Sequence, residues 1–154
     1  MDVQVVGLRG EASFERMVEH FTSLGGEVVI MDPMYVCGKD HVISAVMHAE
    51  RSFENGTNRS KTLLTEIILY VAGERQISKA MERMRPKQGC KDYALALLDQ
   101  PADLKLDEIG MERDDSILSA TKEKAEMMGL ENPFGIPYED LALENVALLD
   151  LAKY

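Results

Sequence analysis

The chain has 154 residues, of which 45% are hydrophobic and none is Trp, and its formal net charge is −10. A domain of this size buries roughly 68–70% of its unfolded surface, so it needs no disulfide or metal to stabilise it. No run of roughly 18 uncharged apolar residues occurs and the first residues do not resemble a signal peptide, so we expect a cytoplasmic protein without a membrane partner.

The first third of the sequence predicts a strand, a helix, a strand and a second helix. Residues 3–8 alternate weakly and are rich in Val, which is typical of a strand. Apolar residues at three- and four-residue steps predict a helix over residues 13–24. The β-branched residues 28–31 predict a short buried strand. Asp40 is the expected N-cap of a helix over residues 40–55.

Neither the histidines nor the cysteines form a recognisable metal motif. His41 and His48 lie seven residues apart on the predicted helix, about 10.5 Å along its axis, which is too far to share one metal without a third ligand. Cys37 and Cys90 lack a partner at ligand spacing, and a cytoplasmic protein keeps its thiols reduced. We therefore expect structural or surface histidines, two free thiols, and neither a metal nor a cofactor.

The centre of the sequence predicts two helices that meet at a glycine. Between residues 62 and 72, apolar pairs recur four residues apart, the spacing of one buried helical stripe. Gly73 follows as a C-terminal stop, and residues 77–84 resume the helical spacing until Pro86. Residues 74–76 contain no Ser, Thr, Asp or Asn to cap the second helix, so its first backbone N–H groups are available to an anion.

The last third predicts an interior strand and two more helices. Residues 92–98 are apolar on both faces, as in a strand covered on each side. Residues 102–111 fit either a short helix or a strand, residues 114–128 predict a helix, and residues 139–152 predict a final helix. We therefore expect an α/β fold over residues 1–154, a single domain with a mixed central sheet of three to five strands and about six helices.

Charge is distributed unevenly along the chain. Residues 55–91 hold eight Lys or Arg and three Asp or Glu, a net charge of +5. Residues 1–54 hold four and nine, and residues 92–154 hold five and 15, for net charges of −5 and −10. A local cationic segment on an acidic chain points to an anionic partner, although solvated helix faces are the simpler explanation of such a segment.

No catalytic motif stands out. The sequence contains no P-loop, no dinucleotide-binding glycine pattern, no HExxH and no GxSxG. Glu66 lies in the most apolar helix, where burial raises the pKa of a carboxyl group and suits a general acid. The simpler interpretation is that Glu66 binds a neighbouring backbone or an Arg. We therefore expect no catalytic residues and favour a binding protein.

Most of the chain, from about residue 40 to 151, resembles a known family, the small kinase-binding, tRNA-binding subunit of the KEOPS complex. Its most specific part combines an apolar helix, a glycine hinge and the sequence Arg75-Gln76-Ile77. The segments that carry the likeness are HVISAVMHAERSFENG, TEIILYVAGERQISKAM and ALENVALLDL.

The resemblance implies a non-catalytic adaptor. Members of this family attach to the small atypical kinase of KEOPS, support its ATPase, and hold the 3′ CCA end of tRNA. The complex makes threonylcarbamoyladenosine in tRNA, and catalysis resides in another subunit. The implied partners are therefore the kinase and tRNA, and no DNA is expected.

Physical reasoning selects candidate residues for both partners. Single-stranded RNA is bound by phosphate neutralisation and by stacking of unpaired bases. Tyr70 is a candidate stacking face, although it fits a core position as well. The candidate RNA contacts are Arg59, Lys61, Arg75, Gln76, Lys79 and Arg83. The candidate kinase contacts are Val146, Leu149 and Leu151, because a final helix that is apolar on more than one side either packs deeply or meets a partner.

Two other functions remain open at this stage. One is a small hydrolase or transferase in which Glu66 acts with His41 or His48. The other is a purely structural subunit without affinity for RNA.

Overall fold

A four-stranded antiparallel sheet forms the centre of the computed structural model, which describes residues 1–152. Its strands lie in the order β2 (Glu27–Met31), β3 (Asp92–Leu98), β1 (Val3–Arg9) and β4 (Glu112–Arg113). The sequence predicts a mixed sheet, and this detail is wrong. β1 and β2 run in the same direction, but β3 lies between them and pairs antiparallel with both, so no parallel pair forms.

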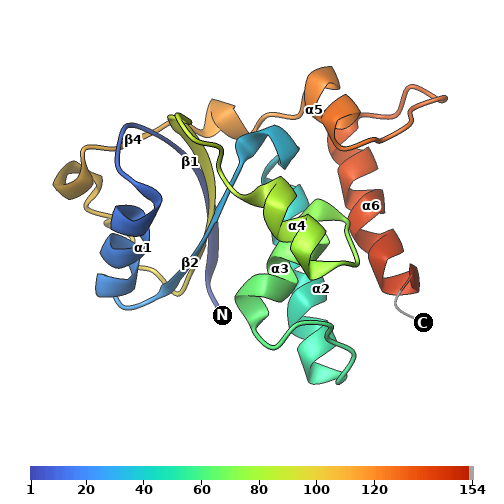
Figure 1. The fold of residues 1–154 in the computed structure, drawn as a ribbon, viewed down its shortest axis with the longest axis horizontal. Coiled ribbons are helices and arrows are strands. Elements are labelled where there is room, and N and C mark those ends of the chain that lie inside the picture. Colours follow the sequence, from blue (N-terminus) through green and yellow to red (C-terminus); the bar gives the residue numbers. More distant parts are fainter. Residues whose placement is uncertain (153–154) are drawn as a thin grey trace.

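Helices cover both faces of this sheet, which confirms the predicted α/β class. α1 covers one face, while α2, α3 and α4 cover the other and α6 lies outermost on that side (Figure 1). Six α-helices occur within residues 1–152. They are α1 (Phe14–Ser23), α2 (Lys39–Glu54), α3 (Leu63–Ala72), α4 (Ile77–Met84), α5 (Lys122–Met127) and α6 (Tyr138–Ala152).

The alternation of side chains along the strands separates two cores. Val29 and Met31 of β2 point to the larger core beneath α2 and α3, whereas Val28 and Ile30 point to the smaller core beneath α1. β3 is buried from Tyr93 onward, since it is central and covered on both faces. Its apolar character on both faces is the feature that predicts it from the sequence.

Two helix starts differ from their predictions. α2 begins at Lys39 after Gly38, and Asp40 lies inside its first turn rather than at the cap. The helix expected over residues 114–128 is divided into the 3-10 helix η3 (Asp115–Leu118) and α5, which Thr121 caps, and the short β4 comes just before it. The ambiguous residues before β4 contain another 3-10 helix, η2 (Leu106–Ile109).

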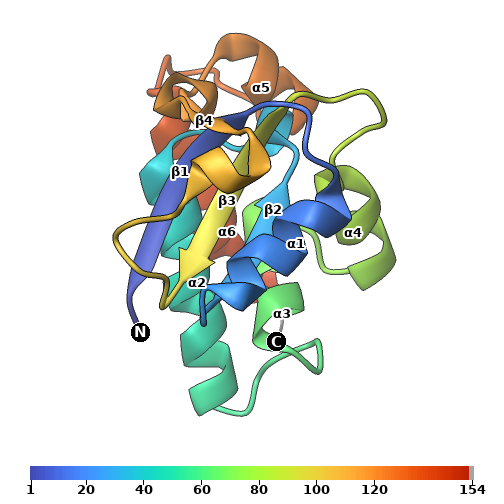
Figure 2. The same cartoon turned by 90° about the vertical axis from the view of Figure 1, so that its left-hand side faces the viewer.

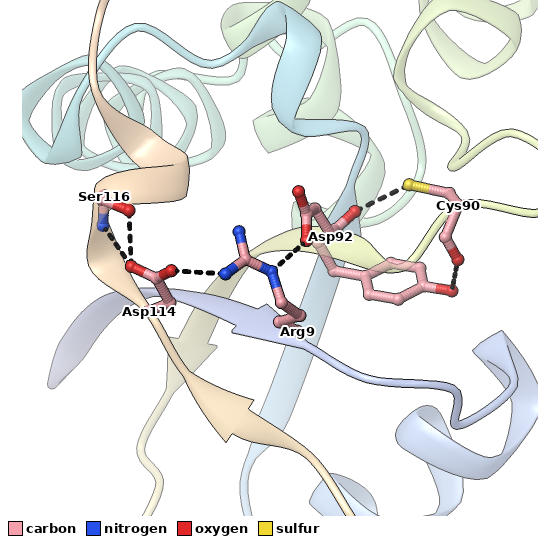
Figure 3. Close-up of polar contacts among 6 residues, drawn as sticks. Arg9, Cys90, Asp92, Asp114 and Ser116 are labelled. Atoms are coloured by element: carbon pink, nitrogen blue, oxygen red, sulfur yellow. Dashed lines mark hydrogen bonds and ion pairs between the residues drawn. The ribbon is translucent and has the colours of Figure 1, made fainter.

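A polar cluster around Arg9 holds Asp114, which caps the short 3-10 helix η3 rather than a long α-helix. Arg9 Nε lies 2.8 Å from Asp92 Oδ1 and its Nη1 lies 2.9 Å from Asp114 Oδ2 (Figure 3). Asp114 also accepts the backbone N–H and the hydroxyl of Ser116, which closes a tight turn. These contacts fix the corner after β4 against β1 and β3.

His41 joins α2 to the end of α3. Its Nδ1 accepts the backbone N–H of Cys37 at 3.0 Å, and its Nε2 donates to the backbone oxygen of Val71 at 3.0 Å. The ring is fully buried. Burial lowers the pKa of His41 to about 4, because a charged imidazole would lose its hydration.

We expect His41→Gln to flatten the acid dependence of stability. In the unfolded chain the pKa of His41 is near 6.5. Between pH 6.5 and 4, His41 is therefore protonated in the unfolded state and neutral in the folded state. The native protein should lose on the order of 3 kcal/mol across that window from this residue. Urea unfolding at several pH values measures this loss. An equal loss of stability in the His41→Gln variant would show that His41 does not cause the acid dependence.

Candidate nucleic-acid and partner interfaces

α3 and α4 meet at a sharp corner that packs against α6. Thr62 caps α3 by accepting the backbone N–H of Thr65, and Gly73 ends it with a left-handed backbone, at a φ of 64°. A Cβ atom at Gly73 would lie 2.0 Å from Nδ2 of Asn145 on α6. Glycine is therefore required at the corner both for its φ angle and for this close approach.

The start of α4 lacks a side-chain cap, as the sequence predicts. Gln76, the residue before the helix, makes no capping bond. The structure adds a contact that was not expected, because Oε1 of Glu74 accepts the backbone N–H groups of Arg75 and Gln76, at 3.0 and 3.3 Å. The corner thus supplies a carboxylate of its own. Within residues 1–152, the amides of Ile77 and Ser78 still have no acceptor.

The candidate RNA contacts form two exposed groups at opposite ends of α3. Arg59 and Lys61 precede the helix, and we call them the loop pair. Arg75, Gln76 and Lys79 follow it, and we call them the corner group. Ten helical residues separate the two groups by about 15 Å. The structure therefore places them on one helical hairpin but not at one point.

Arg83 differs from the other candidates because it is half-buried and engaged within the fold. Its Nη1 donates to the backbone oxygen of Ala72 at 3.1 Å, and its guanidinium lies 5.8 Å from the centre of the Tyr35 ring. Lys87 has a similar role, since its Nζ lies 3.0 Å from Asp32 Oδ2 and donates to carbonyl groups at the end of α4. Both cations therefore stabilise helix ends.

Glu66 holds the loop pair in place. Its fully buried carboxylate accepts the backbone N–H groups of Arg59 and Ser60, at 3.1 and 3.0 Å. The hydroxyls of Ser52 and Ser60 lie 2.9 and 3.0 Å from its oxygens. This confirms the simpler interpretation of Glu66, namely that it binds a neighbouring backbone.

The proposed catalytic pairs are not assembled. Both ring nitrogens of His41 bind backbone groups, and Nδ1 of His48 contacts the carboxylate of Asp150 on α6. Glu66 is occupied by the loop before α3. Within residues 1–152, no group of three or more His, Cys, Asp and Glu side chains is placed to hold a metal ion. In the same residues, no helix has the length and apolar content of a membrane span.

Tyr70 offers no stacking face for a base, because its side chain is fully buried. Its hydroxyl donates to the carboxylate of Asp150, which also binds His48. Burial and then this hydrogen bond raise the pKa of Tyr70, so it stays protonated. The three side chains join α2, α3 and α6.

The outer face of α6 is apolar at two positions. Of the candidate kinase contacts, Val146 is fully buried and Leu149 is 4% exposed, so both belong to the core. Leu151 is 72% exposed, and Leu148, which the sequence analysis did not select, is 50% exposed. The two exposed leucines are three residues apart and share a helical face, which is the sequence signal that pairs them.

A cleft of about 370 Å³ separates this face from the corner. Its lining includes Arg75 from the corner and Leu148 from α6. The candidate surface for RNA and the apolar surface of α6 are therefore adjacent, although the sequence treats them as unrelated. The residues that line the cleft are Gly73, Glu74, Arg75, Asn145, Leu148 and Leu149.

Comparison with models of known protein families shows the family to which the chain belongs. The model of the family described as Kinase binding protein CGI-121 matches residues 15–132, which is most of the chain. The protein belongs to the CGI-121 family. No curated protein matches the chain. The part matched to the CGI-121 model includes the α3–α4 hairpin and ends before α6 begins.

We expect Glu66→Gln to destabilise this CGI-121 protein by about 3 kcal/mol. An amide NH₂ group would replace one acceptor oxygen and face backbone donors that have no alternative. Urea unfolding measures the loss, and amide exchange at Ser60 should accelerate. Glu82→Gln on the exposed face of α4 is the matched control, with an expected effect within about 0.5 kcal/mol. Equal stability of the Glu66 variant and the native protein would show that the carboxylate does not hold the loop.

Proposed function

We propose that the protein is a non-catalytic subunit of the KEOPS complex, which modifies tRNA to threonylcarbamoyladenosine. In this role it binds the small atypical kinase subunit, supports its ATPase and recruits tRNA through the 3′ CCA end, in the cytoplasm. Membership of a kinase-binding family supports the first part. The observation that carries the second part is the corner group beside an uncapped helix start.

The corner suits a phosphate backbone better than a compact anion. The side chains of Arg75 and Lys79 are exposed and form no ion pair within residues 1–152, so they are available to external phosphates. Glu74 already occupies the amides before α4, which lowers the affinity for an isolated anion. A single-stranded end instead contacts several cations in succession along its backbone. The loop pair, about 15 Å away, extends this track.

An adaptor without catalytic groups agrees with the structural contacts that the candidate acid and base residues make. Glu66, His41 and Asp150 are all engaged in contacts between helices. Catalysis in the complex is then assigned to other subunits. The exposed leucines of α6 supply an apolar surface for the kinase, next to the cleft at the corner.

Replacing Arg75 and Lys79 together with Ala should weaken the binding of tRNA. With about four phosphate contacts in the native protein, log affinity should fall with log salt at a slope near −3, and loss of two contacts should reduce the slope by about 1.4. Gel-shift titration across salt concentrations measures both quantities. Arg16→Ala, on α1 across the sheet, removes an exposed charge and should leave the slope unchanged.

Two outcomes would count against tRNA recruitment. One is a native slope near zero. The other is equal affinity for intact tRNA and for tRNA trimmed of its 3′ end, which would instead indicate a subunit without specific affinity for the CCA end.

Replacing Leu148 and Leu151 with Asn should lower the affinity for the kinase subunit about tenfold or more, because exposed apolar side chains at an interface centre contribute disproportionately. Isothermal titration calorimetry measures this affinity. The melting temperature should hardly change, since both side chains are largely exposed. Met127→Asn on α5 is the control for an exposed apolar residue elsewhere. Unchanged affinity in the double variant would exclude this face as the kinase interface.

A further inference from the structure

The outer edge of β2 is open. Within residues 1–152, β2 lies at the end of the sheet and pairs only with β3 (Figure 2). The backbone N–H of Asp32, just after the strand, points away from β3 and donates to the oxygen of Met84 on α4. Because successive residues of a strand alternate, the N–H and C=O groups of Val28 and Ile30 point to the same outer side. Within residues 1–152 they have no partner there.

These polar groups lie in an apolar groove. The groove has a volume of about 210 Å³, and its walls come from β2, α1, α3 and α4. Val28 and Ile30 are only 9% and 6% exposed, so both residues lie deep in the groove. Backbone groups that are neither paired nor well hydrated are costly, which makes this edge a favourable partner for another strand. The other walls are formed by Phe14, Leu64, Thr65, Ile68, Met81 and Arg85.

One cation marks the end of the groove. Arg85 is the single charged residue of the lining, and its side chain is exposed. Its guanidinium forms no ion pair or hydrogen bond within residues 1–152. It lies beside Met84, at the end of β2 where Asp32 binds α4. An occupant with a carboxylate at this end would complement the groove in charge as well as in polarity.

We propose that this groove binds an extended apolar segment of a partner protein, which adds to β2 as a short fifth strand and places a carboxylate beside Arg85. Strand addition supplies the backbone hydrogen bonds that Val28 and Ile30 lack, and the pocket receives one apolar side chain. A dry apolar cavity of about 150 Å³ is large enough for benzene, so the volume here suffices. The proposal does not depend on the proposed tRNA or kinase functions.

The shape of the groove disfavours a second copy of the chain as the occupant. Phe14 on α1 and Met81 on α4 both line the groove, so the edge lies in a recess between helices. A second β2 edge would lie in an identical recess, and the flanking helices would meet before the strands paired. A single extended chain is narrow enough to enter between them.

The test uses the peptide acetyl-Asp-Val-Thr-Leu-Thr-Asp-amide, which carries an Asp at each end so that either strand direction brings a carboxylate to Arg85. We expect it to shift the NMR signals of Leu64, Ile68 and Met81 and to slow amide exchange at Val28 and Ile30. An analogue that is N-methylated on alternate residues, and so cannot form the ladder, should bind at least about tenfold more weakly.

Charge reversal at Arg85 provides the matched variant. Arg85→Glu should weaken the binding of the acidic peptide about tenfold and favour a peptide with Lys in place of each Asp. Its melting temperature checks that the fold is retained. Binding without protection of Val28 and Ile30, equal binding of the methylated analogue, or no binding at millimolar peptide would overturn the proposal. A concentration-dependent dimer in sedimentation that protects the same amides would overturn it in favour of a second copy.

Discussion

The buried carboxylate of Glu66 is the interaction on which the loop before α3, and with it the loop pair Arg59 and Lys61, depends. Its oxygens accept two backbone N–H groups from the loop before α3 and lie beside the hydroxyl of Ser52 on α2. A buried charge is tolerated only when several donors surround it, and here the backbone N–H groups of Arg59 and Ser60 and the hydroxyl of Ser60 all come from one loop. The anion therefore selects one loop conformation, and with it the positions of Arg59 and Lys61.

A second constraint fixes the other end of α3. Gly73 approaches Asn145 of α6 so closely that a Cβ atom there would overlap the Asn145 amide group. Tyr70 and His48 meet at Asp150, five residues further along α6 than Asn145. The corner and the final helix are thereby joined as one surface, with the cleft between them. A ligand at Arg75 and a partner on the exposed leucines of α6 would be neighbours. Their proximity is a simple physical basis for coupling between the two binding events.

The sequence predicts most elements because their signals are local. Alternation, helical spacing, and the stops at Gly73 and Pro86 give the strands β1, β2 and β3 and five of the helices nearly in place. The divided segment after β4 was missed because Asp114 binds Arg9, 105 residues earlier, and no local pattern records that contact. The antiparallel sheet was missed for a related reason, since the insertion of β3 between β1 and β2 is a long-range event.

For the candidate site, residue type predicts which side chains are charged, but not which of them are free to contact an external phosphate. Arg83 and Lys87 belong to the cationic segment, yet both are engaged at helix ends, and Lys91 forms an ion pair with Glu11. The net charge of +5 over residues 55–91 therefore overstates what a phosphate backbone would meet. Under the proposed function, few free cations would give the isolated protein only modest affinity for RNA. Within an assembly that presents further contacts to the same RNA, effective concentration converts such a weak site into strong overall binding.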